Sequence, residues 1–386
     1  MSKLEELINK LCPNGVEFKK LIEITTWDKK FNGIDNSYKK IFKHISAEQL
    51  KKFNSDSGSI KLLSTGIFDG YAEEEKCKEF INKGDVVTLP SGGTANIKYF
   101  SGKFLDSGNI IAITRDEKKY NIKYIYYNLI NIQSLIQSFY RGSGVKHPDM
   151  ANILNISIPV PPLEVQCEIV RILDNFTLLS AELSAELSAR QKQYEYYSKE
   201  LFNFNDYVEF ISLESIADIG TGSSNTNEAV EDGQYPFYVR SQQVYYKNNY
   251  EYDDNSIITS GDGVGVGKIF HYTDGKYALH QRAYRINITN NKVNSKYFYY
   301  YMKSTFYDYI QKNAFNSSVT SIRRPMLNKY PVPILSLEKQ NKIVNILEKF
   351  EKLCNDISEG LPAEIEARKK QYEYYRDKLL TFKELK

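Results

Sequence analysis

The chain has 386 residues, with 51 Lys and Arg against 48 Asp and Glu, which leaves a formal net charge of +3. This length is enough for two or three domains with substantial cores, and 26% charged and 41% hydrophobic residues are ordinary for a globular protein. The charge balance excludes a basic tail or a strongly cationic body. Binding to nucleic acid would therefore need local basic loops or charge supplied by partner chains.

The cysteines are scattered and form no CxxC pair; they are Cys12, Cys77, Cys167 and Cys354. This spacing fits neither a disulfide framework nor a zinc site, so we expect a cytoplasmic protein without a metal site. No apolar run approaches the length of a membrane span. Tyrosine is the outlier, with 31 residues, and it suits half-buried interfaces and groove surfaces.

The chain begins with a segment that is repeated in part later on. Residues 2–12 predict a short amphipathic helix, because apolar side chains recur at helical spacing, at Leu4, Leu7, Ile8 and Leu11. The sequence VEFKKLIEI (residues 16–24) then matches VEFISLESI (residues 208–216), which comes after a long predicted helix. The two halves are therefore interpreted as a circularly permuted tandem repeat, and we expect the N-terminus to lie beside the C-terminus.

Two globular segments of different sequence share one predicted layout. Each should have two strands separated by a glycine-rich turn, then a tyrosine-rich helix, a small polar loop and the sequence Pro-Val-Pro. The strands are predicted at 84–89 and 109–114, and at 255–260 and 283–288. The helices begin after Asn121 and Asn294, the loops span 141–147 and 316–324, and the prolines lie at 159–161 and 331–333. Since proline continues neither a ladder nor a helix, we expect this run to close each globule.

A longer segment occurs twice, at 163–204 and again from residue 337. Both copies open with LExQxxIVxILxxF and end on ARxKQYEYYxxxL, which indicates duplicated architecture. Apolar residues recur in steps of three and four, a heptad seam that includes Val165, Ile169, Ile172, Phe176 and Leu179, and in the second copy Ile343, Ile346, Phe350 and Leu353. We expect a kink or a break near Gly360 and Pro362 of the second copy.

These patterns predict an α+β fold: two mixed globules separated by two long helices that pack as an antiparallel coiled coil, with pseudo-two-fold symmetry from the permuted repeat. The predicted boundaries are an N-terminal helix at 1–15, which pairs with the C-terminal helix, a first globule at 16–158, a central helical region at 159–207, a second globule at 208–330 and a C-terminal helical region at 331–386. The alternative is that each helical seam packs only on its own globule.

Catalytic motifs are missing from the sequence. The glycine-rich SGDGVGVGKI (residues 260–269) has the spacing of neither a Walker A loop nor a dinucleotide fingerprint. It and the weaker SGGTANIK (residues 91–98) are interpreted as turns between strands, which would also let backbone and lysine approach a phosphate. Basic loop residues remain as candidate DNA contacts, with solvated surface charge as the alternative for each: Lys98, Lys103, Arg141, Lys146, His147, Lys268, His280, Gln281, Arg282, Arg323 and Arg324.

Two divergent domains that alternate with repeated IVxILxxF and ARxKQYEYY helices resemble the specificity (S) subunit of type I restriction-modification systems. The resemblance implies two target recognition domains that each read half of a bipartite double-stranded DNA sequence. It also implies that the helices bind two methyltransferase (M) subunits, and that restriction (R) subunits join the full complex. S-adenosylmethionine, ATP and magnesium would then belong to those partners, and this chain would be non-catalytic and hold no cofactor. The expected helical contacts to M are Arg190, Tyr194, Tyr196, Tyr197, Arg368, Tyr372, Tyr374 and Tyr375.

The first long helix contains the tandem tetrapeptide SAELSAEL (residues 180–187). Four residues rotate a helix ~40° beyond a full turn, close to the ~35° between neighbouring base pairs of B-DNA. This suggests that each tetrapeptide sets the gap between half-sites, although the stretch also fits a simple run of helix formers. Three alternatives to the whole interpretation stay open: a protein-interaction scaffold without a DNA role, an enzyme with an unfamiliar motif, and an orphan or regulatory specificity subunit.

Overall fold

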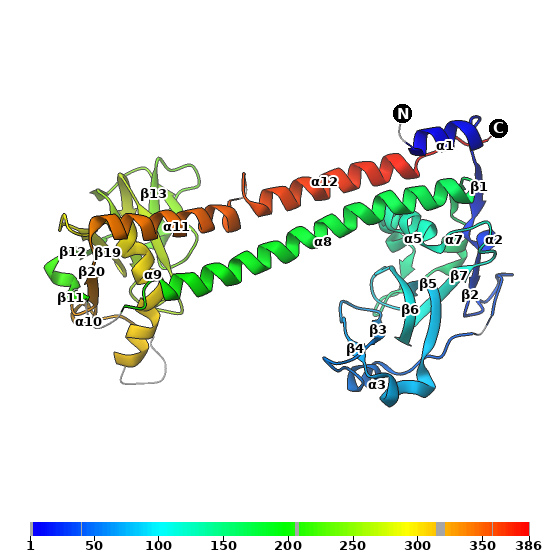
Figure 1. The fold of residues 1–386 in the computed structure, drawn as a ribbon, viewed down its shortest axis with the longest axis horizontal. Helices are drawn as coiled ribbons and strands as arrows, with labels where there is room; N and C mark the ends of the chain where they lie inside the picture. The colour runs from blue at the N-terminus through cyan, green and yellow to red at the C-terminus, as the bar shows by residue number, and fades with distance from the viewer. Residues whose placement is uncertain (1–2, 40, 205–207, 314–320, 357, 386) are drawn as a thin grey trace. The chain divides into compact units, whose positions relative to one another are not determined.

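The computed structural model describes residues 3–39, 41–204, 208–313, 321–356 and 358–385, and its fold is mixed α/β (Figure 1). The chain forms two compact units. Unit 1 comprises residues 1–182 and 366–386, and unit 2 comprises residues 183–365. The long helix α8 (Leu163–Glu200) contributes its first half to unit 1 and its second half to unit 2.

A mixed sheet with the strand order β2-β7-β5-β6-β3-β4 forms the centre of unit 1. Its strands are β2 (Thr25–Trp27), β3 (Ile60–Ser64), β4 (Tyr71–Ala72), β5 (Asn82–Pro90), β6 (Lys98–Ser107) and β7 (Asn109–Thr114). Successive side chains of a strand point to opposite faces. Val87 accordingly packs in the core beneath the helices, whereas its neighbour Val86 packs with Phe42 and Phe104 on the other face.

Short helices and two further strand pairs complete unit 1. The helices are α2 (Leu21–Ile24), α3 (Ala47–Lys52), α4 (Glu74–Cys77), the 3-10 turn η1 (Lys78–Phe80), α5 (Ile122–Asn131), α6 (Gln133–Ser138) and α7 (Met150–Leu154). Strand β1 (Glu17–Lys20) pairs with β10 (Ser157–Val160), and β8 (Tyr140–Arg141) pairs with β9 (His147–Pro148). Helix α5 buries its apolar side on the sheet, next to β5 and β6.

Unit 2 contains two sheets and a tyrosine-rich core. One sheet has the order β12-β19-β16-β17 and the other β14-β13-β18-β15. The strands are β11 (Glu209–Ser212), β12 (Ala217–Thr221), β13 (Tyr235–Tyr238), β14 (Tyr245–Lys247), β15 (Tyr252–Asp253), β16 (Ser256–Ser260), β17 (Phe270–Thr273), β18 (Lys276–Leu279), β19 (Ala283–Ile288) and β20 (Pro331–Ile334). The helices are η2 (Leu213–Ser215), η3 (Thr226–Glu228), α9 (Ser295–Asn313) and α10 (Arg324–Asn328). Tyr330 is 1% exposed, and the rings of Phe298, Tyr301, Phe306 and Tyr309 surround it.

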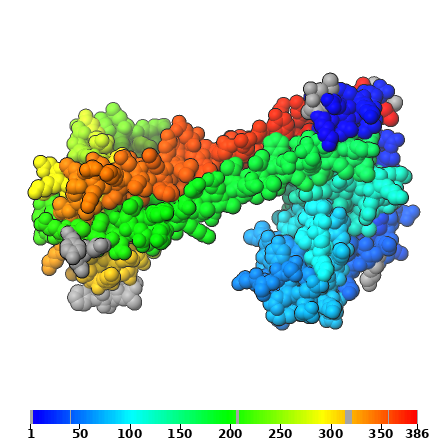
Figure 2. All heavy atoms as spheres, in the orientation of Figure 1, coloured from blue at the N-terminus to red at the C-terminus, as the bar shows by residue number. Residues whose placement is uncertain are grey.

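The second copy of the long repeat is two helices, α11 (Leu337–Asn355) and α12 (Leu361–Leu380), so the predicted break near Gly360 is confirmed. The predicted N-terminal helix is also confirmed, as α1 (Lys3–Leu11). Its neighbour in space is the C-terminal segment: the Val16 amide donates to Lys383 O at 2.9 Å, and the Leu385 amide donates to Val16 O at 2.9 Å. Figures 1 and 2 show the blue N-terminal helix beside the red end of the chain, as the permuted repeat predicts.

The two units are joined to their long helices by the same hydrogen bonds. In unit 1, the buried Gln166 side chain accepts from the Asn121 amide at 2.9 Å and donates to the carbonyls of Lys119 and Pro161. In unit 2, the buried Gln340 accepts from the Asn294 amide at 2.8 Å and donates to the carbonyls of Lys292 and Leu335. We refer to these two arrangements as the glutamine joints. They fix the start of each tyrosine-rich helix to the first turn of α8 or α11.

Residues at equivalent positions near the two glutamine joints also make the same contacts in both units. Tyr124 donates to Pro159 O in unit 1, and Tyr297 donates to Pro333 O in unit 2. The paired strands share one register, because Phe18 lies opposite Pro159 in β1 and β10, and Phe210 lies opposite Pro333 in β11 and β20. The similarity of residues 16–24 and 208–216 is therefore accompanied by the same local structure.

Two expectations about local structure were wrong. Strand β6 lies between the strands predicted at 84–89 and 109–114, and β17 and β18 lie between those predicted at 255–260 and 283–288. Each pair was expected to be separated by a glycine-rich turn alone. Pro-Val-Pro does not exclude a backbone ladder, because Pro159 lies within β10, and Pro331 and Pro333 lie within β20, where a missing N–H is tolerated. Pro161 directly follows β10. Several residues of the predicted heptad seam lie at the surface, with exposed fractions of 45% for Leu179, 42% for Ile346 and 38% for Leu353.

Candidate DNA-recognition surfaces

Loops at one edge of unit 1 are connected by polar contacts, and we call residues 64–69, 91–97 and 141–147 loop edge 1. The Gly93 amide donates to Lys146 O at 2.8 Å, and His147 Nδ1 lies 2.6 Å from Ser91 O. A Cβ atom at Gly92 would lie 2.9 Å from Val145, so glycine permits this close approach. The glycine-rich turn and the polar loop, which are far apart in the sequence, therefore form one surface.

The basic residues predicted in unit 1 divide into two groups. Arg141, Lys146 and His147 are exposed on loop edge 1, although Arg141 also lies 3.7 Å from the Asp149 carboxylate. Lys98 instead serves the loop itself, because its ammonium donates to Ser64 O at 2.7 Å and to Gly66 O at 2.6 Å; burial lowers its pKa. Lys103 lies in the middle of β6 and pairs with Glu74 at 2.6 Å.

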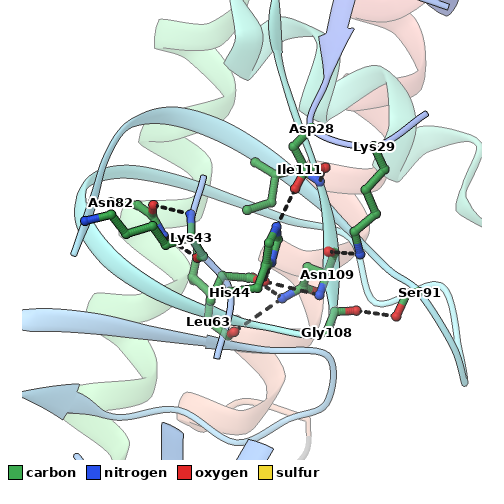
Figure 3. A network of polar contacts seen from close by, with 11 residues as sticks. Asp28, Lys29, Lys43, His44, Leu63, Asn82, Ser91, Gly108, Asn109 and Ile111 are labelled. Carbon is green, nitrogen blue, oxygen red and sulfur yellow. Dashed lines mark hydrogen bonds and ion pairs between the residues drawn. The ribbon is translucent and has the colours of Figure 1, made fainter. Parts of the chain in front are cut away.

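An ionic cluster of two buried carboxylates and one partly exposed histidine lies in unit 1, and we call His44, Asp28 and Asp106 the histidine clamp (Figure 3). His44 Nε2 lies 2.7 Å from Asp28 Oδ2, and Nδ1 lies 2.8 Å from Asp106 Oδ2. The two carboxylates are 1% and 0% exposed. The hydrogen bonds that His44 donates to Asp106 and Asp28 raise its pKa to about 9, so the ring is an imidazolium at neutral pH.

The clamp reaches the loops through a short polar chain. Asp106 accepts from the Asn109 side chain at 2.6 Å, and the same amide donates to Leu63 O at the end of β3. The neighbouring Gly108 carbonyl accepts from both the amide and the hydroxyl of Ser91. Figure 3 shows these side chains and carbonyls converging from separate strands. The bases of two loops of loop edge 1 are thereby anchored to the sheet.

In unit 2, the glycine-rich turn lies beside basic residues, and we call Arg240 with residues 261–268, 280–282 and 321–324 loop edge 2. Asp262 accepts from Arg240 at 2.7 Å and from Arg282 at 3.2 Å. Burial alone would raise the pKa of Asp262, but the two guanidinium groups outweigh it and the pKa lies below its usual range. The Ile322 amide donates to Gly261 O at 2.8 Å, which brings the segment 321–324 to the same place.

The residues predicted in unit 2 are placed as follows. Arg282, Arg323 and Arg324 are exposed on loop edge 2, and Lys268 lies over the Tyr307 ring, 5.3 Å from its centre. Gln281 is exposed and donates to Asn225. His280 is 4% exposed, accepts from the Arg282 amide and has a pKa lowered by burial and by nearby arginine charge. Residues 316–320 of the predicted polar loop lie outside the described residues.

Arg240 is a basic residue of this surface that was not among the sequence-based candidates. It comes shortly after β13 as an isolated charge, and only the contact with Asp262 places it beside Arg282. Its position adds a further cation to loop edge 2. A basic residue just after a predicted strand is the signal that could have drawn attention to it.

The predicted helical contacts show the same arrangement in both units. Arg190 donates to Gln193 and Arg368 donates to Gln371, each at 3.0 Å. The outward residues Tyr196 and Tyr374 are each 61% exposed, whereas Tyr194 and Tyr372 are half-buried. Tyr375 stacks on Phe176 in unit 1 with ring centres 5.5 Å apart, and Tyr197 lies 6.1 Å from Phe350 in unit 2. The first residue of each block's Tyr-Tyr pair therefore points to solvent, and the second contacts the phenylalanine of the other copy.

Within the described ranges, no group of three or more His, Cys, Asp or Glu residues could hold a metal ion. A helix long and apolar enough to cross a membrane is likewise absent from the part of the chain that the structure describes.

Comparison with known proteins identifies the family. A sequence model of the type I restriction modification DNA specificity domain matches residues 37–190 and 205–367. The chain is 32% identical over 360 residues to the specificity subunit of the type I restriction enzymes EcoR124I and EcoR124II of Escherichia coli, covering 85% of this chain and 88% of that protein. The crystal structure of the S subunit of a type I system from M. genitalium is similar, with a TM-score of 0.63 at 15% identity over 95% of this chain and 96% of that one.

The HsdS subunit of Thermoanaerobacter tengcongensis also shares the fold, with a TM-score of 0.50 at 13% identity over 96% of this chain and 97% of that one. The family model covers more than half of the chain, in two matches that include all residues of both loop edges. This chain therefore belongs to the family of type I restriction-modification specificity subunits.

Proposed function

We propose that this chain reads a bipartite DNA sequence, with loop edge 1 contacting one half-site and loop edge 2 the other. The observation that carries the proposal is that each unit has its own surface of exposed basic side chains on loops fixed to a sheet. Arg141 and Lys146 supply the cations in unit 1, and Arg240, Arg282 and Arg323 supply them in unit 2. Arginine and lysine bind phosphates and guanine edges, so both surfaces are suited to a DNA groove.

The duplicated contacts support a circularly permuted arrangement with pseudo-two-fold symmetry. Both glutamine joints use equivalent residues, and each phenylalanine of the IVxILxxF motif contacts a tyrosine of the other copy's KQYEYY block. This exchange is what antiparallel packing of α8 against α11 and α12 produces, and we propose that they form an antiparallel coiled coil. A two-fold arrangement would offer two equivalent docking faces, one for each of two M subunits.

We propose further that the chain is non-catalytic, that it works with M and R subunits, and that S-adenosylmethionine, ATP and magnesium bind to those partners. The exposed Tyr196 and Tyr374 are the proposed contacts to M, because tyrosine is favoured at interfaces and both side chains are mostly accessible on this chain. Isothermal titration of the isolated chain with S-adenosylmethionine tests the first point. Stoichiometric binding to this chain would contradict a non-catalytic role.

Sequencing of modified bases in the host genome, with and without the gene, tests the main proposal. A bipartite motif with methylated adenine should disappear when the gene is deleted and return when it is restored. Motifs that persist after deletion would contradict the proposal. A protein-binding scaffold is less well supported, because the tyrosines of α9 that suggested it lie largely in the core.

We also propose that the tetrapeptide in α8 sets the gap between the half-sites. The stretch is helical throughout, with Leu183 and Leu187 half-buried on one face. Deletion of residues 184–187 would keep the heptad-like spacing and rotate the rest of the helix by ~40° beyond a full turn. The methylated motif should keep both half-sites while its gap shortens by about one base pair. A matched variant with Ser184→Ala should keep the original gap, and an unchanged gap in the deletion variant would contradict the idea.

A further inference from the structure

We propose that Ile67 and Val264 are specificity-determining residues, whose side chains contact the 5-methyl groups of thymines in the major groove of the two half-sites. This inference rests on the proposed reading of DNA by the two loop edges. Ile67 is 100% exposed and Val264 is 99% exposed. Among the described residues, the next most exposed large hydrophobic side chain is Val145, at 66%. These two side chains therefore have no packing role in the folded chain.

The loop that carries Ile67 is held in place by hydrogen bonds on both sides. The Gly66 carbonyl accepts from Lys98 Nζ at 2.6 Å, from Asn96 Nδ2 at 2.9 Å and from the Ser64 hydroxyl at 3.3 Å. Ser64 also donates to Phe68 O, and Lys98 also donates to Ser64 O. Hydrophobic residues of flexible loops gain burial by folding back onto the protein. This loop is fixed by donors from β6 and its preceding turn, so Ile67 is held away from the protein.

The loop that carries Val264 is fixed by other means. Gly263 before it has a φ of +82°, a conformation that favours glycine, and a Cβ atom at Gly265 after it would lie 2.2 Å from the Ile269 side chain. Val266 is 3% exposed and anchors the turn in the core. On the other side, Asp262 is held by Arg240 and Arg282. Val264 is therefore the exposed tip of a turn whose two sides are anchored.

Each tip lies beside groups that suit DNA. Val264 is two residues from Asp262, whose arginine partners belong to loop edge 2. Ile67 lies on loop edge 1, directly after Gly66, whose carbonyl accepts from the Asn96 side chain. Asn96 belongs to the glycine-rich turn at 91–97, which contacts Lys146 through Gly93 and His147 through Ser91. Cations that bind phosphates would bring both tips to a groove. The thymine methyl is the apolar group that the bases present in the major groove, and aliphatic side chains contact it.

The isolation of Val264 at the tip of its turn argues against a protein partner for loop edge 2. Protein interfaces bury contiguous patches with aromatic anchors, whereas Val264 lies between two glycines and beyond them has Asp262 and the buried Val266 as chain neighbours. Ile67 lies at a hollow that Phe68, Tyr99 and Phe100 also line, and these three rings are only partly exposed. A lone aliphatic side chain among cations fits a surface that is polar except for isolated methyl groups. Such a contact adds discrimination between A·T and G·C pairs without a hydrogen bond.

The test uses the complex of the full chain with its M subunits, and DNA duplexes that contain the motif found by genome methylation mapping. Each thymine of a half-site, on either strand, is replaced in turn by uracil, which lacks the methyl group. One uracil in the half-site read by unit 1 should slow methylation about fourfold for the unaltered complex, the effect of one buried methyl group. The complex with Ile67→Ala should methylate the thymine-containing duplex more slowly than the unaltered complex, by a similar factor. Replacing that thymine with uracil should not slow the variant complex further. Val264→Ala should behave in the same way for the other half-site.

Leu135→Ala is the matched control, because this leucine of α6 is 47% exposed in unit 1 and lies outside loop edge 1. It should keep both the rate and the response to uracil. The inference is overturned if Ile67→Ala and uracil reduce the rate independently, or if neither changes it, while methylation still depends on this chain. If methylation does not depend on this chain at all, the proposed function itself fails, and the two failures are thereby distinguished.

Discussion

The histidine clamp should make the free energy of unfolding of unit 1 depend on pH, and the substitution His44→Gln should remove this dependence. His44→Gln replaces the imidazolium with a neutral side chain and leaves Asp28 and Asp106 buried without a cation. Removing one partner of a buried ion pair typically costs ~3–5 kcal/mol. Since the His44 side chain is 30% exposed, we expect a loss of about 3 kcal/mol in the free energy of unfolding near pH 6.5, at the lower end of that range.

The pH dependence comes from the direction of the pKa shift. The pKa of His44 is raised to about 9, so its contribution is fully present below its ordinary pKa of 6.5 and is lost as pH rises through about 9. The full shift corresponds to roughly 3 kcal/mol at ~1.4 kcal/mol per pKa unit. Solvent screening at the exposed part of the ring reduces this to about 2 kcal/mol. Between pH 6.5 and 10, the difference between the unaltered chain and His44→Gln should therefore narrow from about 3 to about 1 kcal/mol.

Trp27 makes the measurement specific to unit 1. It is the chain's single tryptophan, is 1% exposed in β2, and immediately precedes Asp28. Urea unfolding monitored by Trp27 fluorescence at several pH values gives the free energy of unfolding of the region around the clamp. His147→Gln is the control, because that histidine is exposed on loop edge 1 and outside the clamp. If the difference between His44→Gln and the unaltered chain stays constant from pH 6.5 to 10, the clamp does not act as described.

Three further predictions concern the joint, the DNA surface and the helices. Gln340→Leu should lower the free energy of unfolding of unit 2 by ~2–3 kcal/mol, because a buried amide and two carbonyls lose their hydrogen-bond partner. Calorimetry tests this, and Gln281→Leu is the control because that glutamine is exposed. Arg282→Ala in the M complex should weaken binding to any DNA sequence and reduce the slope of log affinity against log salt by ~1, whereas equal slopes by fluorescence anisotropy would exclude a phosphate contact. Tyr196→Ser should weaken binding of M subunits in gel filtration without changing the melting temperature, since its ring is largely exposed.

Features set by local pattern were predictable from the sequence. Helix α1 is expected from its leucine spacing, and the break between α11 and α12 is expected from Gly360 and the neighbouring proline. Strand β6 was missed because KYFSGKFLDS mixes polar residues and glycine with its apolar ones. It forms because β5 and β3 pair with it on both sides, and neighbours of this kind outweigh weak local preference.

Long-range contacts decide the parts that were not predictable. His44 is isolated in the sequence, and its partners Asp28 and Asp106 are 16 and 62 residues away. Lys98 looked like a phosphate ligand, yet two carbonyls of another loop use its ammonium. Whether a basic residue can contact a ligand depends on acceptors that lie far from it in the sequence. The sequence therefore indicates which basic residues belong to the proposed DNA surface, but not which of them are free of partners within the chain.

The glutamine joints have a consequence for how such a protein can change its target. Each joint uses one side chain to hold three backbone groups, and backbone groups are the same whatever the globule's sequence. A globule can therefore diverge, or be exchanged by recombination for another, provided that it presents an amide and two carbonyls at the same places. The glutamine joints and the two loop edges use different residues, so under the proposed function a new half-site requires no change in the helices.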